Sequence, residues 1–153
     1  MTIKPSGKPL GAPPGDDRYL KGAPVAARII AEVRAEAEAA SAQGWKPKLV
    51  SISVGDTDAV QVYVRNQRRK AEQAVIEFEE RHFPDSVTPG ELEAAIRGMN
   101  VDPRVTGIII QRPVPAHIPI RTLQGAVHPL KDVEGMHPAS IGNIVYNQLD
   151  LAP

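Results

Sequence analysis

Hydrophobic and polar positions follow a helical period in some parts of the chain and alternate strictly in others. Residues 22–44 have the helical period and end at a glycine. The apolar stripe of this predicted helix consists of Val25, Ile29, Ile30 and Val33. The segment "KLVSISVG", residues 48–55, alternates apolar and polar side chains and predicts a strand. A helix is predicted over 56–74, with Asp56 or Thr57 as its cap, and a second strand over 75–83.

The second half of the chain repeats this order of helix and strand. Thr88 and Glu91 stand three apart before an apolar run, which predicts a capping box and a helix over 88–100. The short β-branched run over 105–111 is typical of a fully buried strand. Three prolines exclude regular structure from "RPVPAHIP", residues 112–119. A short helix is predicted near 120–127, followed by a polar loop and a small helix within 128–144.

Strands that alternate with helices predict an α/β fold with three layers, α-β-α, around a mostly parallel sheet. Ligands of such folds bind beyond the carboxyl ends of the strands. Polar segments follow two of the predicted strands, in "YVRNQRRK" (63–70) and at Gln111, and the "KDVEG" loop (131–135) can fold over them. The sequence therefore predicts a binding site where these segments converge.

Composition narrows the classes of function. The 153 residues contain 18 Lys and Arg and 18 Asp and Glu, so charge gives no reason to expect a nucleic acid or an anionic membrane as partner. No apolar run reaches the roughly 20 residues that span a bilayer, and the N-terminus lacks the apolar core of a secretory signal. Cysteine is absent and the four histidines lack ligand spacing, so no metal site is predicted. We expect a cytoplasmic protein with a flexible tail over 1–17.

Single residues of the predicted site also have ordinary structural explanations. Tyr63 and Gln67 stand four apart and so share a helix face, but a lone tyrosine there is more often a residue at the rim of the core. Arg69 and Lys70 would usually belong to a solvated helix face, and Gln111 would cap a strand end. Only the spacing of the whole set indicates a ligand site.

Three segments together carry a resemblance to a known family. "VGDTDAVQVYVRNQRRKA", "GIIIQRPVPAHI" and "HPLKDVEGMHPASIGNI" resemble, in order and spacing, the bifunctional methylenetetrahydrofolate dehydrogenase/methenyltetrahydrofolate cyclohydrolase (FolD) family. The resemblance covers about residue 19 to the end and matches that family's N-terminal, folate-binding catalytic domain, which we place at 18–153. The family's Rossmann domain, which binds NADP, is expected to be absent from this chain, so no cofactor is expected in it.

The resemblance implies roles for individual residues. Tyr63 matches the tyrosine that packs against the folate, and Gln111 matches the glutamine that holds the catalytic lysine. That lysine itself falls on Gln67. In the third block, usually K-D-V-D-G, Asp132 is as expected and Glu134 replaces the aspartate that binds the pterin. Pro113, in the second block, is expected to form part of a rigid wall beside a tetrahydrofolate derivative.

Two further positions of the first block also depart from the family pattern. Its second lysine falls on Arg69 and its serine on Val60. A glutamine cannot exchange a proton near neutral pH, and losing a general acid–base group typically slows a reaction about 10²–10⁴-fold. Lys70, three residues after Gln67, is the candidate substitute base, although it starts nearly one helical turn further along.

Three functions follow from these matches and departures. The first is an enzyme domain that is catalytic only with a nucleotide-binding domain. The second is a non-catalytic folate-binding pseudoenzyme, and the third is an interaction module that kept the fold and lost the ligand. The resemblance also implies a homodimer or an NADP-binding domain as partner.

Overall fold

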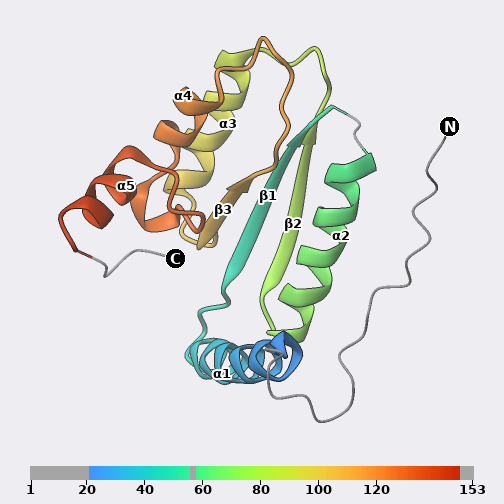
Figure 1. Cartoon of the computed structure of the whole chain (residues 1–153), viewed down its shortest axis with the longest axis vertical. Coiled ribbons are helices and arrows are strands. Elements are labelled where there is room, and N and C mark those ends of the chain that lie inside the picture. Colours follow the sequence, from blue (N-terminus) through green and yellow to red (C-terminus); the bar gives the residue numbers. More distant parts are fainter. Residues whose placement is uncertain (1–20, 56–57, 149–153) are drawn as a thin grey trace, which may run out of the picture.

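A computed structural model describes residues 21–55 and 58–148 of the chain (Figure 1). Helices and strands follow one another in the predicted order. Their bounds are α1 Gly22–Ala42, β1 Lys48–Val54, α2 Asp58–Gln73, β2 Glu77–Phe83, α3 Pro89–Val101, β3 Gly107–Ile110, α4 Ile120–Ala126, the 3₁₀ turn η1 Pro129–Lys131 and α5 Pro138–Val145. The predicted tail over 1–17 and the predicted cap at Asp56 or Thr57 lie outside the described residues.

The strands form one parallel sheet in the order β2-β1-β3. β1 is central, and its Ile52 lies opposite Arg81 of β2 and Ile110 of β3. Figure 1 shows α2 on one side of the sheet and α3 and α4 on the other. The predicted α-β-α arrangement with a mostly parallel sheet is therefore confirmed, and all strand pairs within the described ranges are parallel.

The two faces of β1 differ in chemistry. Val50, Ile52 and Val54 belong to the main hydrophobic core, together with Leu92 and Ile96 of α3. Ser51 and Ser53, which alternate with them, are fully buried on the opposite side of the strand, toward α2. Because a strand alternates its side chains between two faces, the same seven residues build the apolar core and place hydroxyl groups under α2.

The start of α3 confirms the predicted capping box. The Thr88 hydroxyl accepts a hydrogen bond from the backbone N–H of Glu91 at 3.3 Å, and the Glu91 carboxylate accepts one from the Thr88 N–H at 2.8 Å. Pro89 occupies the first turn, where a missing N–H costs nothing. This cap stabilises the helix by about 1 kcal/mol and fixes the beginning of the element that covers the core.

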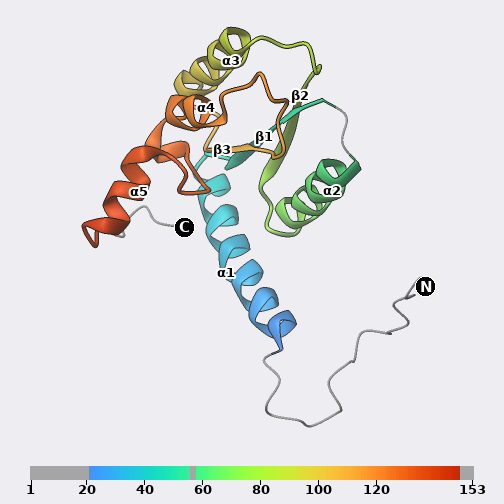
Figure 2. The same cartoon turned by 45° about the horizontal axis from the view of Figure 1, so that its top comes forward.

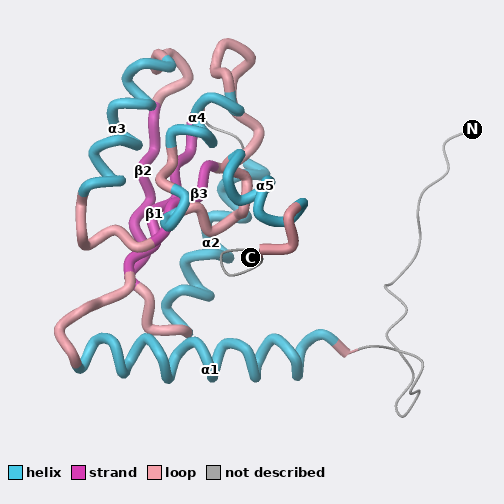
Figure 3. The backbone as a smooth tube through the Cα atoms, turned by 90° about the vertical axis from the view of Figure 1, so that its left-hand side faces the viewer, coloured by secondary structure: helices cyan, strands magenta, loops and turns pink. Residues whose placement is uncertain are grey.

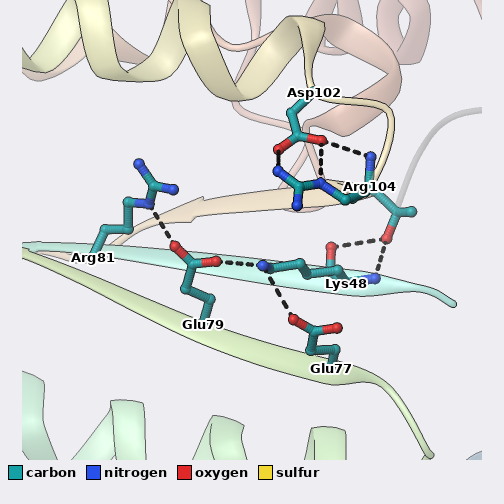
Figure 4. A network of polar contacts seen from close by, with 7 residues as sticks. Lys48, Glu77, Glu79, Arg81, Asp102 and Arg104 are labelled. Atoms are coloured by element: carbon teal, nitrogen blue, oxygen red, sulfur yellow. Dashed lines mark hydrogen bonds and ion pairs between the residues drawn. The ribbon is translucent and has the colours of Figure 1, made fainter.

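Charged side chains line β2, which forms one edge of the sheet. The Lys48 ammonium lies between Glu77, at 3.1 Å, and Glu79, whose carboxylate also binds Arg81 at 2.6 Å (Figure 4). Such charges on an edge strand discourage pairing with another sheet. This network stands on the α3 side of the sheet, away from the two buried serines.

The long helix α1 lies across the ends of the strands and extends beyond the sheet (Figures 2 and 3). Ala37 is its only fully buried residue. Three members of the predicted apolar stripe are exposed, Val25 by 50%, Ile29 by 49% and Val33 by 36%. The stripe thus exists as predicted, but little of the described chain covers it.

Gly44 and Val75 have positive φ angles, and they mark the end of one element and the beginning of another. Gly44 follows α1 with φ +85°, so the predicted end of that helix is confirmed. The strand predicted over 75–83 begins only at Glu77, because Val75 has φ 59° and turns the chain after α2. A β-branched residue is strained in this left-handed region, and the alternation of the sequence does not reveal the turn.

Candidate functional site

Three polar side chains from distant parts of the chain meet between α2 and the sheet. The Gln111 amide nitrogen donates to the Gln67 oxygen Oε1 at 2.6 Å and to the Ser51 hydroxyl oxygen at 2.9 Å. The Ser51 hydroxyl also approaches Gln67 Oε1 at 3.5 Å. The structure therefore brings together the two glutamines that the sequence predicts, and adds a serine that the sequence analysis did not single out.

The burial of this cluster decides what it offers to a ligand. Gln111 is 6% exposed and Ser51 is fully buried, whereas Gln67 is half-buried. Both N–H donors of Gln111 have protein acceptors, and Gln67 uses its oxygen to accept one of them. The amino group of Gln67 has no hydrogen-bond partner among the described residues. Gln67 is therefore the member of the cluster with a donor to spare.

A second polar cluster holds α2 on the sheet next to this site. The Glu80 carboxylate of β2 accepts hydrogen bonds from Ser53 at 3.2 Å and from Gln61 at 3.4 Å. Arg68 lies 3.6 Å from the same carboxylate, and its guanidinium stands 4.9 Å from the centre of the Phe78 ring. Gln61 and Arg68 are two helical turns apart, so they fix the α2 segment that carries Gln67.

Glu134 lies beside Ile110, the last residue of β3. Its carboxylate accepts a hydrogen bond from the backbone N–H of Ile110 at 3.4 Å. Burial raises the pKa of Glu134, and this effect outweighs the Ile110 hydrogen bond and the nearby Arg112 charge, which lower it. A half-buried carboxylate with one weak protein contact retains acceptor capacity for a ligand.

Asp132 holds the loop around it. Its carboxylate oxygens accept hydrogen bonds from the backbone N–H groups of Met136, at 3.2 Å, and His137, at 2.7 Å, and from the Ser140 hydroxyl at 2.9 Å. Burial alone would raise the pKa of Asp132, but these hydrogen bonds bring it below its ordinary value. The structure thus gives Asp132 a role in shaping the loop before α5, while its predicted contact with substrate stays a prediction.

The remaining predicted residues lie at the surface. Tyr63 is 65% exposed on α2, and Pro113 is exposed in the irregular segment after β3. The segment 112–119 contains no helix or strand, as its prolines predict. Lys70 is exposed, and its ammonium donates to the Gln73 side chain at 3.2 Å. The structure does not join Lys70 to Gln111.

A cavity of about 270 Å³ adjoins Gln67 on the side of α1. Gln67 and Lys70 are its polar lining residues, and the others are Ile29, Ile30, Val33, Leu49, Ala71, Ala74 and Ile76. Tyr63, Gln111 and Glu134 are not part of this lining. The cavity therefore borders Gln67, but it is not lined by the other residues predicted to bind the ligand.

The described residues contain no group of three or more His, Asp or Glu side chains placed to hold a metal ion. They also contain no glycine-rich turn between a strand and a helix, the feature that binds the pyrophosphate of a dinucleotide. Gly55 is the one glycine at the described end of β1, and the Thr88 hydroxyl accepts the Glu91 N–H in the first turn of α3. None of the helices in the described ranges is both long and apolar enough to cross a bilayer.

Ser51 and Glu80 are the contacts that sequence reasoning missed. Ser51 alternates with valine and isoleucine like any polar residue of a half-buried strand, and its partner Gln111 is 60 positions away. One signal was available. Two serines on one face of a strand whose residues after Lys48 are otherwise leucine, valine and isoleucine indicate buried hydroxyl groups, which require partners.

The fold and the site together define a parallel α/β domain with an uncharged amide pair beside the carboxyl end of β3. Residues 20–134 match the family described as "Tetrahydrofolate dehydrogenase/cyclohydrolase, catalytic domain". The chain belongs to this family, which confirms the resemblance seen in the sequence.

Individual relatives agree with this assignment. The chain is 76% identical over 140 residues to "Bifunctional protein FolD 2" of Mesorhizobium japonicum, covering 92% of this chain and 46% of that protein. The bifunctional enzyme FolD of Campylobacter jejuni superposes with a TM-score of 0.82 at 30% identity, over 84% of this chain and 46% of that one. FolD of Trypanosoma brucei, solved with NADP and an inhibitor, gives 0.77 at 27% identity, over 82% and 43%. The chain spans about half the length of the curated relatives it matches.

Proposed function

We propose that this chain is the folate-binding half of a methylenetetrahydrofolate dehydrogenase/methenyltetrahydrofolate cyclohydrolase in which the hydrolytic step is slow. One observation carries the proposal. Gln67, at the position of the family's catalytic lysine, is bound to Gln111 at 2.6 Å. Gln111, which the resemblance matches to the glutamine that holds this lysine, is bound here to an uncharged amide.

The other site residues suit a reduced folate. Tyr63 offers an exposed ring face for stacking, and Pro113 belongs to the irregular segment that begins directly after Gln111. The Glu134 carboxylate can accept two hydrogen bonds from the amine and ring N–H of a pterin. Its extra methylene, relative to aspartate, requires the pterin to sit further from the loop.

The proposed loss concerns proton transfer. Hydrolysis of the methenyl group needs an activated water and a proton that moves as the ring opens. A lysine whose pKa is lowered by burial can exchange that proton. Gln67 can orient a water through its amino group, but its amide cannot take up or release a proton near neutral pH. We therefore expect hydrolysis at least about 10²-fold slower than with a lysine at this position.

Hydride transfer needs a nicotinamide cofactor, and the described residues contain no glycine-rich turn of the kind that binds its dinucleotide. The proposal therefore places the dehydrogenase reaction in a protein whose nucleotide-binding domain stands beside this one. The 153 residues alone should not oxidise methylenetetrahydrofolate. Measurable NADP-dependent turnover by this chain would contradict that expectation. A cytoplasmic setting belongs to the same proposal.

Restoring the lysine tests the proposal directly. Gln67→Lys should raise methenyltetrahydrofolate hydrolysis about 10²-fold or more if the missing base alone limits the rate. Gln73→Lys, which adds the same charge further along α2, should leave the rate unchanged. Rapid hydrolysis by the unaltered chain would overturn the proposal. A small gain would mean that Glu134, Val60 or a second domain also limits the reaction.

A non-catalytic role is the second candidate, and the neutral amide pair favours it. A pseudoenzyme would bind a reduced folate without turning it over, and an interaction module would not bind it. Calorimetric titration with tetrahydrofolate separates these two, because only the pseudoenzyme gives saturable heat. Either form could act through a second copy or through an intact homologue.

A further inference from the structure

Ser51 is fully buried on β1, and its hydroxyl oxygen lies 2.9 Å from the amide nitrogen of Gln111. We propose that Ser51 is a positioning residue that, through Gln111, turns the Gln67 amide so that its amino group faces the ligand. The role of the amino group rests on the proposed function. The orientation of the two amides does not, and it can be measured without any ligand.

Two orientations of the Gln111 amide are conceivable, and burial distinguishes them. In the observed one, both N–H donors of Gln111 meet acceptors, on Ser51 and on Gln67. In the reversed one, the Gln111 oxygen would accept from both neighbours and its amino group would lose the two protein acceptors that it has in the observed orientation. Buried N–H groups without partners are rarer and more costly than under-used carbonyl oxygens.

Ser51 supplies the second acceptor that makes the observed orientation complete. Without its hydroxyl oxygen, one N–H of Gln111 would face a methyl group, and the reversed amide would no longer be the worse arrangement. No buried side-chain nitrogen or oxygen in the described part of the chain lacks a partner. As the second acceptor for the Gln111 amino group, the Ser51 hydroxyl favours the arrangement in which the Gln67 oxygen is bound and the Gln67 amino group is left without a protein partner.

This arrangement determines which hydrogen-bonding groups Gln67 offers to a ligand. With Gln67 Oε1 held by Gln111, the side chain presents only N–H donors outward. A lysine ammonium likewise presents only donors, but with a charge. The site thus keeps the hydrogen-bonding character of a lysine toward an acceptor atom of the ligand, without the ability to transfer a proton.

Nuclear magnetic resonance of the ¹⁵N-labelled 153-residue chain tests the orientation. Each glutamine gives two side-chain amide proton signals, which Gln67→Leu and Gln111→Leu variants assign. We expect both Gln111 protons to exchange at least roughly tenfold more slowly than those of exposed Gln43, and the Gln67 protons to exchange within about threefold of them. Protected Gln67 protons with unprotected Gln111 protons would overturn the proposal.

The variant Ser51→Ala isolates the hydroxyl. It should abolish the protection of at least one Gln111 proton and weaken tetrahydrofolate binding by about fivefold to tenfold. The matched control is Ser53→Ala, which removes the other buried hydroxyl of the same strand face, bound instead to Glu80 and His82. That control should leave the Gln111 protons protected.

Ser51→Thr keeps the hydroxyl and should keep the protection, which provides a second variant if Ser51→Ala does not fold. Unchanged Gln111 protection in folded Ser51→Ala would overturn the proposal, whatever its effect on binding. A wild-type chain that shows the expected exchange pattern but binds no tetrahydrofolate would reject the proposed function and leave the role of Ser51 in orienting the amides supported.

Discussion

The Gln111 amide nitrogen lies 2.6 Å from the amide oxygen of Gln67, although 44 positions separate the two residues. Their contact joins the end of β3 to the middle of α2 across the central strand. Two neutral amides satisfy each other without the desolvation that a buried charge would suffer. The fold therefore tolerates a glutamine at position 67.

The direction of this hydrogen bond predicts unequal effects of two matched substitutions. Gln67→Glu keeps an acceptor for the Gln111 N–H, so it should lower the free energy of unfolding by less than about 1 kcal/mol. Gln111→Glu places a carboxylate at a 6% exposed position and removes the N–H donors that bind Ser51 and Gln67. It should therefore lower the free energy of unfolding by about 1–3 kcal/mol. Urea unfolding at pH 7 measures both. Equal losses would contradict the assigned direction.

Lys70 should not act as the substitute base. Its ammonium binds the Gln73 side chain and is exposed, so neither burial nor contact with Gln111 prepares it for proton transfer. Lys70→Ala should leave the residual hydrolysis of methenyltetrahydrofolate within about twofold of the unaltered chain, where a lost base would cost about 10²-fold or more. A drop of that larger size would assign the reaction to Lys70.

Glu134 should govern folate affinity and its dependence on pH. Glu134→Ala leaves a pterin edge without its acceptor, which should weaken binding by about 1–3 kcal/mol. Because burial raises the pKa of Glu134, the carboxylate loses its charge at a higher pH than an ordinary glutamate. Affinity should therefore fall as the pH drops toward and through that raised pKa. Calorimetry from pH 7 downward measures this, and Glu134→Gln should flatten the profile.

The Asp132 carboxylate should stabilise the folded chain. An asparagine there cannot accept all of the hydrogen bonds from Met136, His137 and Ser140, so Asp132→Asn should lower the free energy of unfolding by about 1–3 kcal/mol. The pKa of Asp132 is lowered in the folded chain. Its contribution is therefore present above its ordinary pKa of 3.8 and lost as the pH falls through the lower folded value.

The measurement for Asp132 is unfolding at pH 7 and at lower pH. The difference between wild type and Asp132→Asn should shrink in acid. Glu72→Gln removes an exposed carboxylate of α2 that has no partner among the described residues, and it should change stability by less than about 0.5 kcal/mol. A constant difference at all pH values would show that the carboxylate charge is not responsible.

The exposed apolar residues of α1 should promote association of the chain. Ile29 is 49% exposed between Val25 and Val33, and contiguous apolar surface of this kind favours contact with another protein surface. Light scattering should show a mass that rises with concentration. Ile29→Glu should reduce this, whereas Val101→Glu, at a separate residue that is 82% exposed, should not. A strict monomer at high concentration would contradict the prediction.

Local chemistry was enough to locate most elements from the sequence. The Thr88 and Glu91 pair fixes the start of α3, Gly44 marks the end of α1, and the prolines of 112–119 keep that segment irregular. These features depend on residues a few positions apart, whose geometry the backbone itself restricts. The turn at Val75 shows the limit of such reasoning, since the β-branched pair Val75 and Ile76 favours a strand while the backbone of Val75 turns the chain.

The polar segments at the strand ends and the family match together located the candidate site, and the tertiary structure decided its chemistry. The sequence by itself determined the order of strands and helices, the uncharged residue at position 67 and the polar residue at the end of β3. Only the fold decided that Ser51 joins the two glutamines, that Asp132 holds its own loop and that α1 leaves its apolar stripe exposed. Each depends on strand register and on which helix covers which face, and these are set by contacts among residues far apart in the chain.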